Sequence, residues 1–110
     1  MYVRPKMLFF GSPSCDRCIR YQVLLSKELT LHENNFKYVN GDDFDNKEIQ
    51  DLCDYHNVDE YPHVKIYALN RCIYEEIADL NVKEIVRIMT NEVEIKDASQ
   101  YTTGQSDKPQ

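Results

Sequence analysis

Two cysteines with a reactive spacing stand near the start of the chain, in the stretch GSPSCDRCIRY at residues 11–21. Cys15 and Cys18 are separated by two residues and come shortly after an apolar run, Met-Leu-Phe-Phe. A C-x-x-C pair can act as a redox dithiol, supply half of a zinc site, or be two small buried hydrophobic residues. The choice between these depends on the elements that position the pair.

Composition and charge describe an ordinary globular protein. The chain has 110 residues, of which 42% are hydrophobic and 29% charged, and this suits one folded domain. The net charge of -6 argues against nucleic-acid binding, because such surfaces carry clustered Lys and Arg. No run reaches the roughly 18 apolar residues of a membrane span, and the run before Gly11 is short for a signal peptide. We therefore expect a monomeric cytoplasmic protein whose partners are neither nucleic acid nor membrane.

Apolar patterning in the first half predicts alternating strands and helices. Residues 6–10 form an apolar run typical of a strand buried on both faces, and residues 36–39 predict a second strand. Between them, residues 15 to about 31 contain no Gly or Pro, so a helix should begin at the cysteine pair. A capping pattern at Asp45 predicts a second helix that continues to about His56.

The second half predicts a hairpin and a last helix. Pro62 disfavours a helix at the residue before it, and residues 63–68 read as a third strand. The connection to residues 72–77 is so short that only an antiparallel hairpin fits, and paired glutamates suggest that this fourth strand is an edge. Asn81 should cap a helix whose apolar positions continue to Val93.

The predicted order is β-α-β-α-β-β-α, an α/β fold with a four-stranded mixed sheet flanked by three helices. We place this domain at residues 1–95. Residues 96–110 have little to bury, and we expect a disordered C-terminal tail there.

This order, with C-x-x-C at the first strand-to-helix junction and Tyr-Pro opening the third strand in HNVDEYPHVKIY, resembles the thioredoxin superfamily. The resemblance covers about residues 6–93 and implies a thioredoxin-like fold of the smaller, glutaredoxin-like size. It implies that Pro62 is cis and lies beside the cysteines. Tyr61 would then offer its backbone to a substrate chain.

The resemblance also implies the activity of a dithiol-disulfide oxidoreductase. Cys15 would attack a substrate disulfide and Cys18 would resolve the mixed disulfide. A cysteine at a helix start faces unpaired N–H groups and the positive end of the helix dipole, so we expect a lowered pKa for Cys15. Beside Tyr61 and Pro62, candidates for substrate binding are Pro13, Arg17 and His63, the last of which is equally well explained by simple exposure.

Partners and cofactors follow from the same resemblance. The substrates would be protein disulfides, with ribonucleotide reductase as an example that the family suggests. The redox-active disulfide would be the only redox group, with no other cofactor and no metal, and a thioredoxin reductase or glutathione would supply the electrons.

Four positions and one segment depart from the family pattern. Asp16 and Arg17 stand where thioredoxins usually have Gly-Pro, and Ser14 stands where they have Trp. Phe9 occupies the place of a buried acid that helps proton transfer in thioredoxins. Residues 76–80 lack the Gly-Gly with which glutaredoxins usually hold glutathione, which weakens the alternative of a glutathione-dependent glutaredoxin.

Two alternatives belong to other classes. One is a thioredoxin-fold binding module without turnover. The other is a zinc site, because Cys15, Cys18, Cys53 and His56 make a nominal Cys3His set. Cys53, however, falls on the apolar face of its predicted helix, where a cysteine usually packs. Cys72 is expected to be a strand residue, with a regulatory thiol as the alternative.

Overall fold

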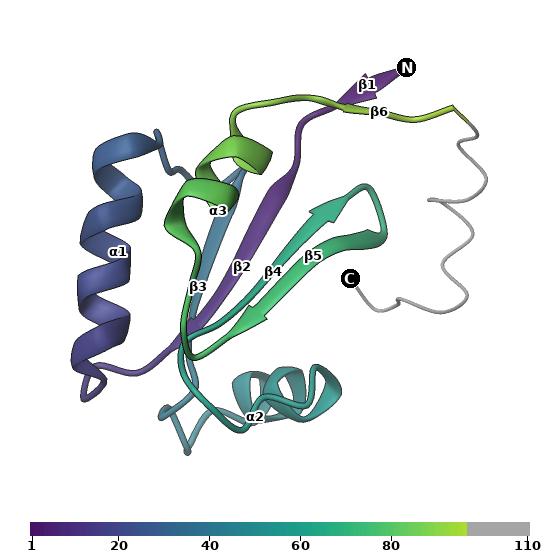
Figure 1. Ribbon diagram of the computed structural model, residues 1–110. Coiled ribbons are helices and arrows are strands. Elements are labelled where there is room, and N and C mark those ends of the chain that lie inside the picture. The colour runs from purple at the N-terminus through teal and green to yellow at the C-terminus, as the bar shows by residue number, and fades with distance from the viewer. Residues whose placement is uncertain (97–110) are drawn as a thin grey trace.

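Four strands form the central sheet, in the order β3-β2-β4-β5 (Figure 1). The computed structural model describes residues 1–96, so nearly all of the predicted tail lies outside the described residues. β2 pairs with β3 in parallel and with β4 antiparallel, and β4 and β5 form the predicted antiparallel hairpin with β5 at the edge. The strands are β2 (Lys6–Gly11), β3 (Phe36–Asn40), β4 (His63–Ala68) and β5 (Arg71–Ile77). The mixed four-stranded sheet is therefore confirmed.

Three helices accompany the sheet: α1 (Asp16–Glu28), α2 (Lys47–Tyr55) and α3 (Val82–Met89). Each begins after a side chain that accepts a hydrogen bond from the backbone N–H three residues later, which satisfies one of the unpaired donors of the first turn. These capping residues are Cys15, Asn46 and Asn81. None of the helices within residues 1–96 is long and apolar enough to cross a membrane.

Two helix boundaries differ from the prediction. Asp45 was expected to cap α2, but the cap is Asn46, whose side chain accepts from the N–H of Ile49 at 3.2 Å. The prediction of α1 to residue 31 is also wrong, because the backbone becomes extended at Leu29. Its N–H still closes the last turn on the carbonyl of Leu25.

A second, two-stranded sheet was missed. β1 (Tyr2–Val3) pairs antiparallel with β6 (Val93–Glu94), next to the N-terminal end of β2 (Figure 1). Val93 was expected on the last helix, but α3 ends at Met89, and Val93 pairs with Val3. Val93 continues the helical spacing only in sequence, and its β-branched side chain suits the strand pair.

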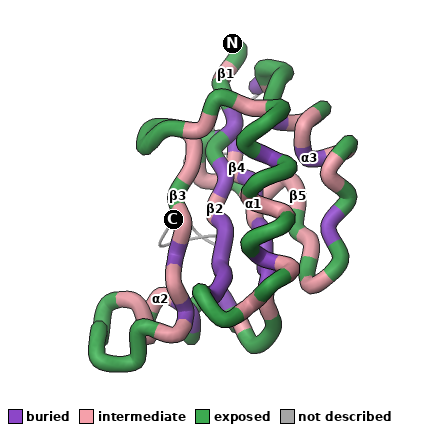
Figure 2. Tube along the Cα trace, turned by 90° about the vertical axis from the view of Figure 1, so that its left-hand side faces the viewer, coloured by how far each residue is buried: buried purple, intermediate pink, exposed green. Residues whose placement is uncertain are grey.

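The sheet has a separate apolar core on each face, because successive strand residues point to opposite sides. On β2, Phe9 packs in one cluster and its neighbour Phe10 in the other. The first cluster includes residues of α1 and α3, and the second includes Cys53 of α2. Figure 2 shows β2 buried over most of its length beside a largely exposed α1. The cysteine pair therefore follows the C-terminal end of β2, at the start of α1, and Cys18 packs in the cluster between the sheet and helices α1 and α3.

Candidate active site

Cys15 and Cys18 form a disulfide at the N-terminus of α1. Their Cα atoms are 5.2 Å apart, and Cys15 is the N-cap residue, with its Sγ accepting from the N–H of Cys18 at 3.1 Å. Cys18 is fully buried under the helix, whereas Cys15 is partly exposed. An exposed first sulfur and a buried second one are the arrangement that a nucleophile and a resolving thiol require.

The loop before β4 lies against this helix start. The peptide bond between Tyr61 and Pro62 is cis, and Pro62 is fully buried. The carbonyl of Pro62 accepts a hydrogen bond from the N–H of Ala78 at 2.8 Å, so the segment after β5 holds the loop from the other side. Ala78 has a φ of 73°, a left-handed conformation that usually favours glycine.

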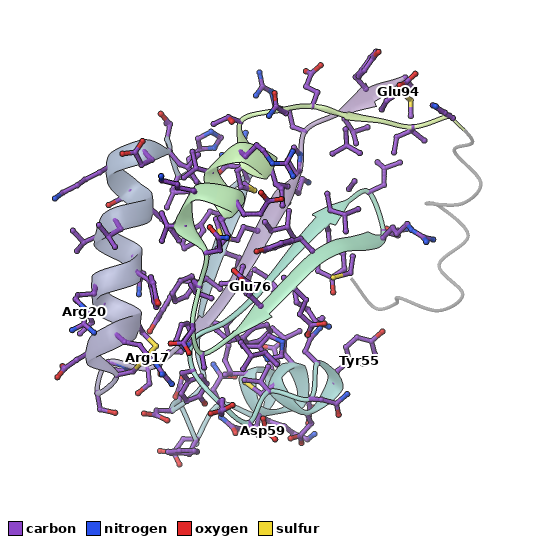
Figure 3. All side chains as sticks on the ribbon, in the orientation of Figure 1. Arg17, Arg20, Tyr55, Asp59, Glu76 and Glu94 are labelled. Atoms are coloured by element: carbon purple, nitrogen blue, oxygen red, sulfur yellow. A yellow bond between two sulfur atoms is a disulfide. The ribbon has the colours of Figure 1, made fainter. Side chains whose placement is uncertain are left out.

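Arg17 joins the two parts of the site. Its Nε and Nη2 donate to the backbone carbonyl of Tyr61 at 3.2 and 2.9 Å, across 44 positions of sequence. Nη1 lies 3.9 Å from a carboxylate oxygen of Asp79. In Figure 3 the guanidinium lies next to the disulfide, with Arg20 further along the same helix. Arg17 was predicted to contact substrate, and the structure places its guanidinium on the backbone carbonyl of Tyr61.

Tyr61 is held by packing on both sides. Its ring contacts both apolar clusters, and its hydroxyl lies so close to Gly41 that a Cβ there would collide with it. Burial raises the pKa of this hydroxyl, with smaller contributions from the charges of Cys53 and Asp42. The side chain is therefore a neutral packing group.

A polar network supports the loop before Cys15. Ser12 is buried and donates to the carboxylate of Asp42, and the hydroxyl of Ser14 lies 2.9 Å from that of Ser12. Asp42 follows β3, which runs parallel to β2, so both strands end at the same edge of the sheet. We did not predict this network. The parallel pairing and the polar turn after residue 40 were the signals that could have found it.

His63 was predicted either to bind substrate or to be simply exposed, and its side chain is instead buried. It is 1% exposed, so the expectation of simple exposure is wrong, and its Nε2 is 2.6 Å from a carboxylate oxygen of Glu75 on β5. Its ring packs on Phe10, with centroids 5.8 Å apart. The His63 side chain is thus part of the face that α2 covers. Pro13, in contrast, is exposed in the loop that leads to Cys15.

The nominal Cys3His set is not brought together. Cys53 packs with Phe10 and Val39 on the face opposite Cys18, and burial raises the pKa of its thiol. Within residues 1–96, no three His, Cys, Asp or Glu side chains lie close enough to hold a metal ion. Cys53 is a packing residue, and Cys72 lies half-buried on β5 with its thiol 3.5 Å from the carbonyl of Tyr74.

Comparison with known proteins supports the fold. No family model and no curated protein sequence matches the chain. Among solved structures, one described only as a malarial protein matches with a TM-score of 0.63 and 11% identity, covering 79% of this chain and 94% of its own.

Two further structures contain thioredoxin domains. Thioredoxin O2 from Arabidopsis thaliana in its oxidised state matches with a TM-score of 0.54 and 16% identity, over 79% of this chain and 73% of its own. The first two thioredoxin domains of Saccharomyces cerevisiae Eps1p match with a TM-score of 0.54 and 20% identity, over 77% of this chain and 33% of the yeast chain. The chain therefore has a thioredoxin-like fold, and its cysteine pair fits a redox role.

Proposed function

We propose that this thioredoxin-fold protein is a dithiol-disulfide oxidoreductase that reduces protein disulfides. The observation that carries the proposal is the Cys15–Cys18 disulfide at the start of α1, next to the loop of Tyr61 and cis Pro62. A structural disulfide would not need one sulfur at the surface and one buried. A redox pair needs this difference, because only the first sulfur meets the substrate.

The chemistry runs in two exchange steps once the pair is reduced. The Cys15 thiolate attacks one sulfur of the substrate disulfide, so that a Cys15–substrate disulfide forms and the other substrate sulfur leaves as a thiolate. The Cys18 thiolate then attacks Sγ of Cys15, which restores the internal disulfide and releases the second substrate thiolate. Both leaving thiolates take protons from solvent. Two electrons pass to the substrate.

The position of Cys15 favours its thiolate. As N-cap residue it lies at the positive end of the helix dipole, and its sulfur already accepts the N–H of Cys18. Cys18 lies one turn along and is fully buried, so it is not exposed to a substrate. Phe9, fully buried on β2, supplies no proton-transfer group there.

A dithiol or thiol reductant must return two electrons after each turnover. We propose a thioredoxin reductase or glutathione for this role, in the cytoplasm, with protein disulfides such as that of a ribonucleotide reductase as substrates. Turnover with NADPH and thioredoxin reductase, compared with glutathione and glutathione reductase, identifies the reductant.

Trapping the intermediate tests the proposal. Cys18→Ser should accumulate a disulfide between Cys15 and substrate that a reducing agent releases, because nothing resolves it. Insulin serves as the model substrate, and mass spectrometry detects the adduct. Cys53→Ser is the matched control, since its thiol lies on the other face of the sheet. Steady insulin reduction by Cys18→Ser would contradict the assignment. Partner function that survives in the double variant Cys15→Ser, Cys18→Ser would favour a binding module.

A further inference from the structure

We propose that Arg17 determines substrate specificity. Its guanidinium covers the Tyr61 carbonyl, and it leaves this carbonyl when the substrate carries an acidic residue next to the attacked cysteine. The inference rests on the proposed function and names the substrate class of the same site. It concerns the residue pair Asp-Arg between the cysteines, which the redox chemistry itself does not use.

Of the two backbone groups that Tyr61 could offer to a substrate chain, one is already hydrogen-bonded. An extended chain that pairs with a backbone uses both an N–H and a C=O. Within residues 1–96, no group hydrogen-bonds to the N–H of Tyr61, whereas its carbonyl accepts two bonds from Arg17. A substrate chain that approaches the exposed sulfur of Cys15 therefore meets a free donor and a covered acceptor.

The Arg17 guanidinium is held weakly enough to leave the Tyr61 carbonyl. The Arg17 side chain is 41% exposed, and its ion-pair partner Asp79 is 94% exposed at 3.9 Å, a distance and exposure at which an ion pair holds little. The carbonyl offers one neutral oxygen. A carboxylate offers two charged oxygens whose spacing matches the guanidinium fork. A substrate carboxylate is thus the better partner for Arg17.

The other charges near the site do not favour an acidic substrate. Asp16, Asp42, Glu60 and Asp79 carry four negative charges near the site, and Arg17 and Arg20 carry two positive ones, so their formal sum is -2. The whole chain is acidic, with a net charge of -6. Long-range steering would therefore not attract an acidic substrate. Direct pairing with Arg17 has to supply the preference.

The experiment measures mixed-disulfide formation in a Cys18→Ser background, because this isolates the step in which substrate docks on Tyr61. Two disulfide peptides are compared that differ only in Glu or Gln on both sides of the attacked cysteine. We expect the parent to react with the Glu peptide about tenfold faster at subsaturating concentration, as for a gained charge-assisted hydrogen bond. Arg17→Met should bring this ratio to one or below, because the remaining charges near the site are mostly acidic. It should also accelerate the Gln peptide, because the Tyr61 carbonyl is uncovered.

Two further variants separate charge from geometry. Arg17→Lys keeps the charge without the fork, so its Glu-to-Gln ratio should fall between those of the parent and Arg17→Met. Arg20→Met removes an equal charge one turn along α1 and should leave the ratio unchanged. Circular dichroism shows whether each variant is folded. If Arg17→Met does not fold, the Glu-to-Gln ratio of Arg17→Lys tests the inference.

Several outcomes would overturn the inference. An unchanged ratio in Arg17→Met, or a Gln peptide that reacts more slowly than with the parent, means that Arg17 does not cover a docking group. If the parent reacts equally with both peptides, the specificity fails and the proposed function stands. If it forms a mixed disulfide with neither peptide nor with insulin, the proposed function fails as well.

Discussion

Asp42 accepts a hydrogen bond from Ser12, and this ties the turn after β3 to the loop that leads into Cys15. The N–H of Ser14 in turn donates to the Ser12 hydroxyl at 3.1 Å. Ser12 is 2% exposed, so its hydroxyl has to find these partners inside the protein. The loop conformation before the nucleophile thus depends on a residue thirty positions away.

Replacing Ser12 with Ala should therefore lower the free energy of unfolding by about 1.5–3 kcal/mol, the range for the loss of a hydrogen bond to a charged group. Urea denaturation followed by circular dichroism measures the change. Ser26→Ala is the matched control, because the Ser26 hydroxyl bonds a backbone carbonyl on the exposed side of α1 and its loss should be nearly neutral. Equal effects of the two substitutions would show that the Asp42 contact contributes nothing to stability.

His56 makes the stability of the fold depend on pH. Burial first, then the neighbouring Lys65 and His63, lower the pKa of His56 from 6.5 to about 4. Nδ1 lies 3.0 Å from Nζ of Lys65, so a second ring proton would face an ammonium group. Above pH 6.5 the ring is neutral in both the folded and unfolded states. Between pH 6.5 and 4 the unfolded chain binds a proton that the folded protein does not, and stability falls as pH is lowered.

The expected loss from this residue is about 3 kcal/mol between pH 6.5 and 4, after which its contribution is constant. Urea denaturation at several pH values measures it. His56→Phe keeps a ring beside Phe10 and should flatten this part of the pH profile, whatever its effect on stability at pH 7. His32→Gln, at an exposed position, should leave the profile unchanged. A profile in His56→Phe as steep as that of the parent would refute the assignment.

Local signals were sufficient for the order of the four strands of the central sheet and the three helices. The cysteine pair at a helix start, the proline before β4 and the short link into β5 each restrict the backbone within a few residues, and the sheet follows from them. The start of α2 was predicted one residue too early, because Asp45 and Asn46 are both good capping residues. The side chain of Asn46 is the one that caps the helix.

Some side-chain contacts between distant segments could not be predicted. Arg17 and Tyr61 are 44 positions apart, and nothing in the sequence near either residue indicates that a guanidinium covers a backbone carbonyl. His63 was misplaced for the same reason, because its partner Glu75 lies on the next strand, twelve positions away. The short strands β1 and β6 were not predicted, because two residues are too few to show the alternating apolar pattern of a strand.

Ala78 offers a test of backbone strain at the edge of the site. Its φ of 73° costs an L-residue about 1–2 kcal/mol relative to its ordinary conformation, whereas glycine adopts it freely. Ala78→Gly should therefore raise the free energy of unfolding by about 1 kcal/mol after the greater freedom of the unfolded chain is subtracted. Ala68→Gly, at a fully buried position of β4, should instead destabilise. Thermal unfolding distinguishes the two, and a loss of stability in Ala78→Gly would contradict the prediction.

Thiol accessibility should rank the cysteines of the reduced protein. Cys15 is partly exposed at the positive end of α1, Cys18 is fully buried, and Cys53 is 6% exposed with its pKa raised by burial. Because the thiolate is the reacting form, timed alkylation with iodoacetamide at pH 7 should modify Cys15 at least about tenfold faster than Cys53. Mass spectrometry of peptides after quenching gives the rate at each position.

The alkylation prediction has two internal checks. In 8 M urea the environments are lost, so all four cysteines should react at about the same rate. In Cys15→Ser the fast phase should vanish from the folded protein while the rate at Cys53 stays unchanged, because that thiol packs on Phe10 behind the sheet. A fast phase that persists in Cys15→Ser would move the nucleophile to another sulfur, and with it the two exchange steps proposed for this site.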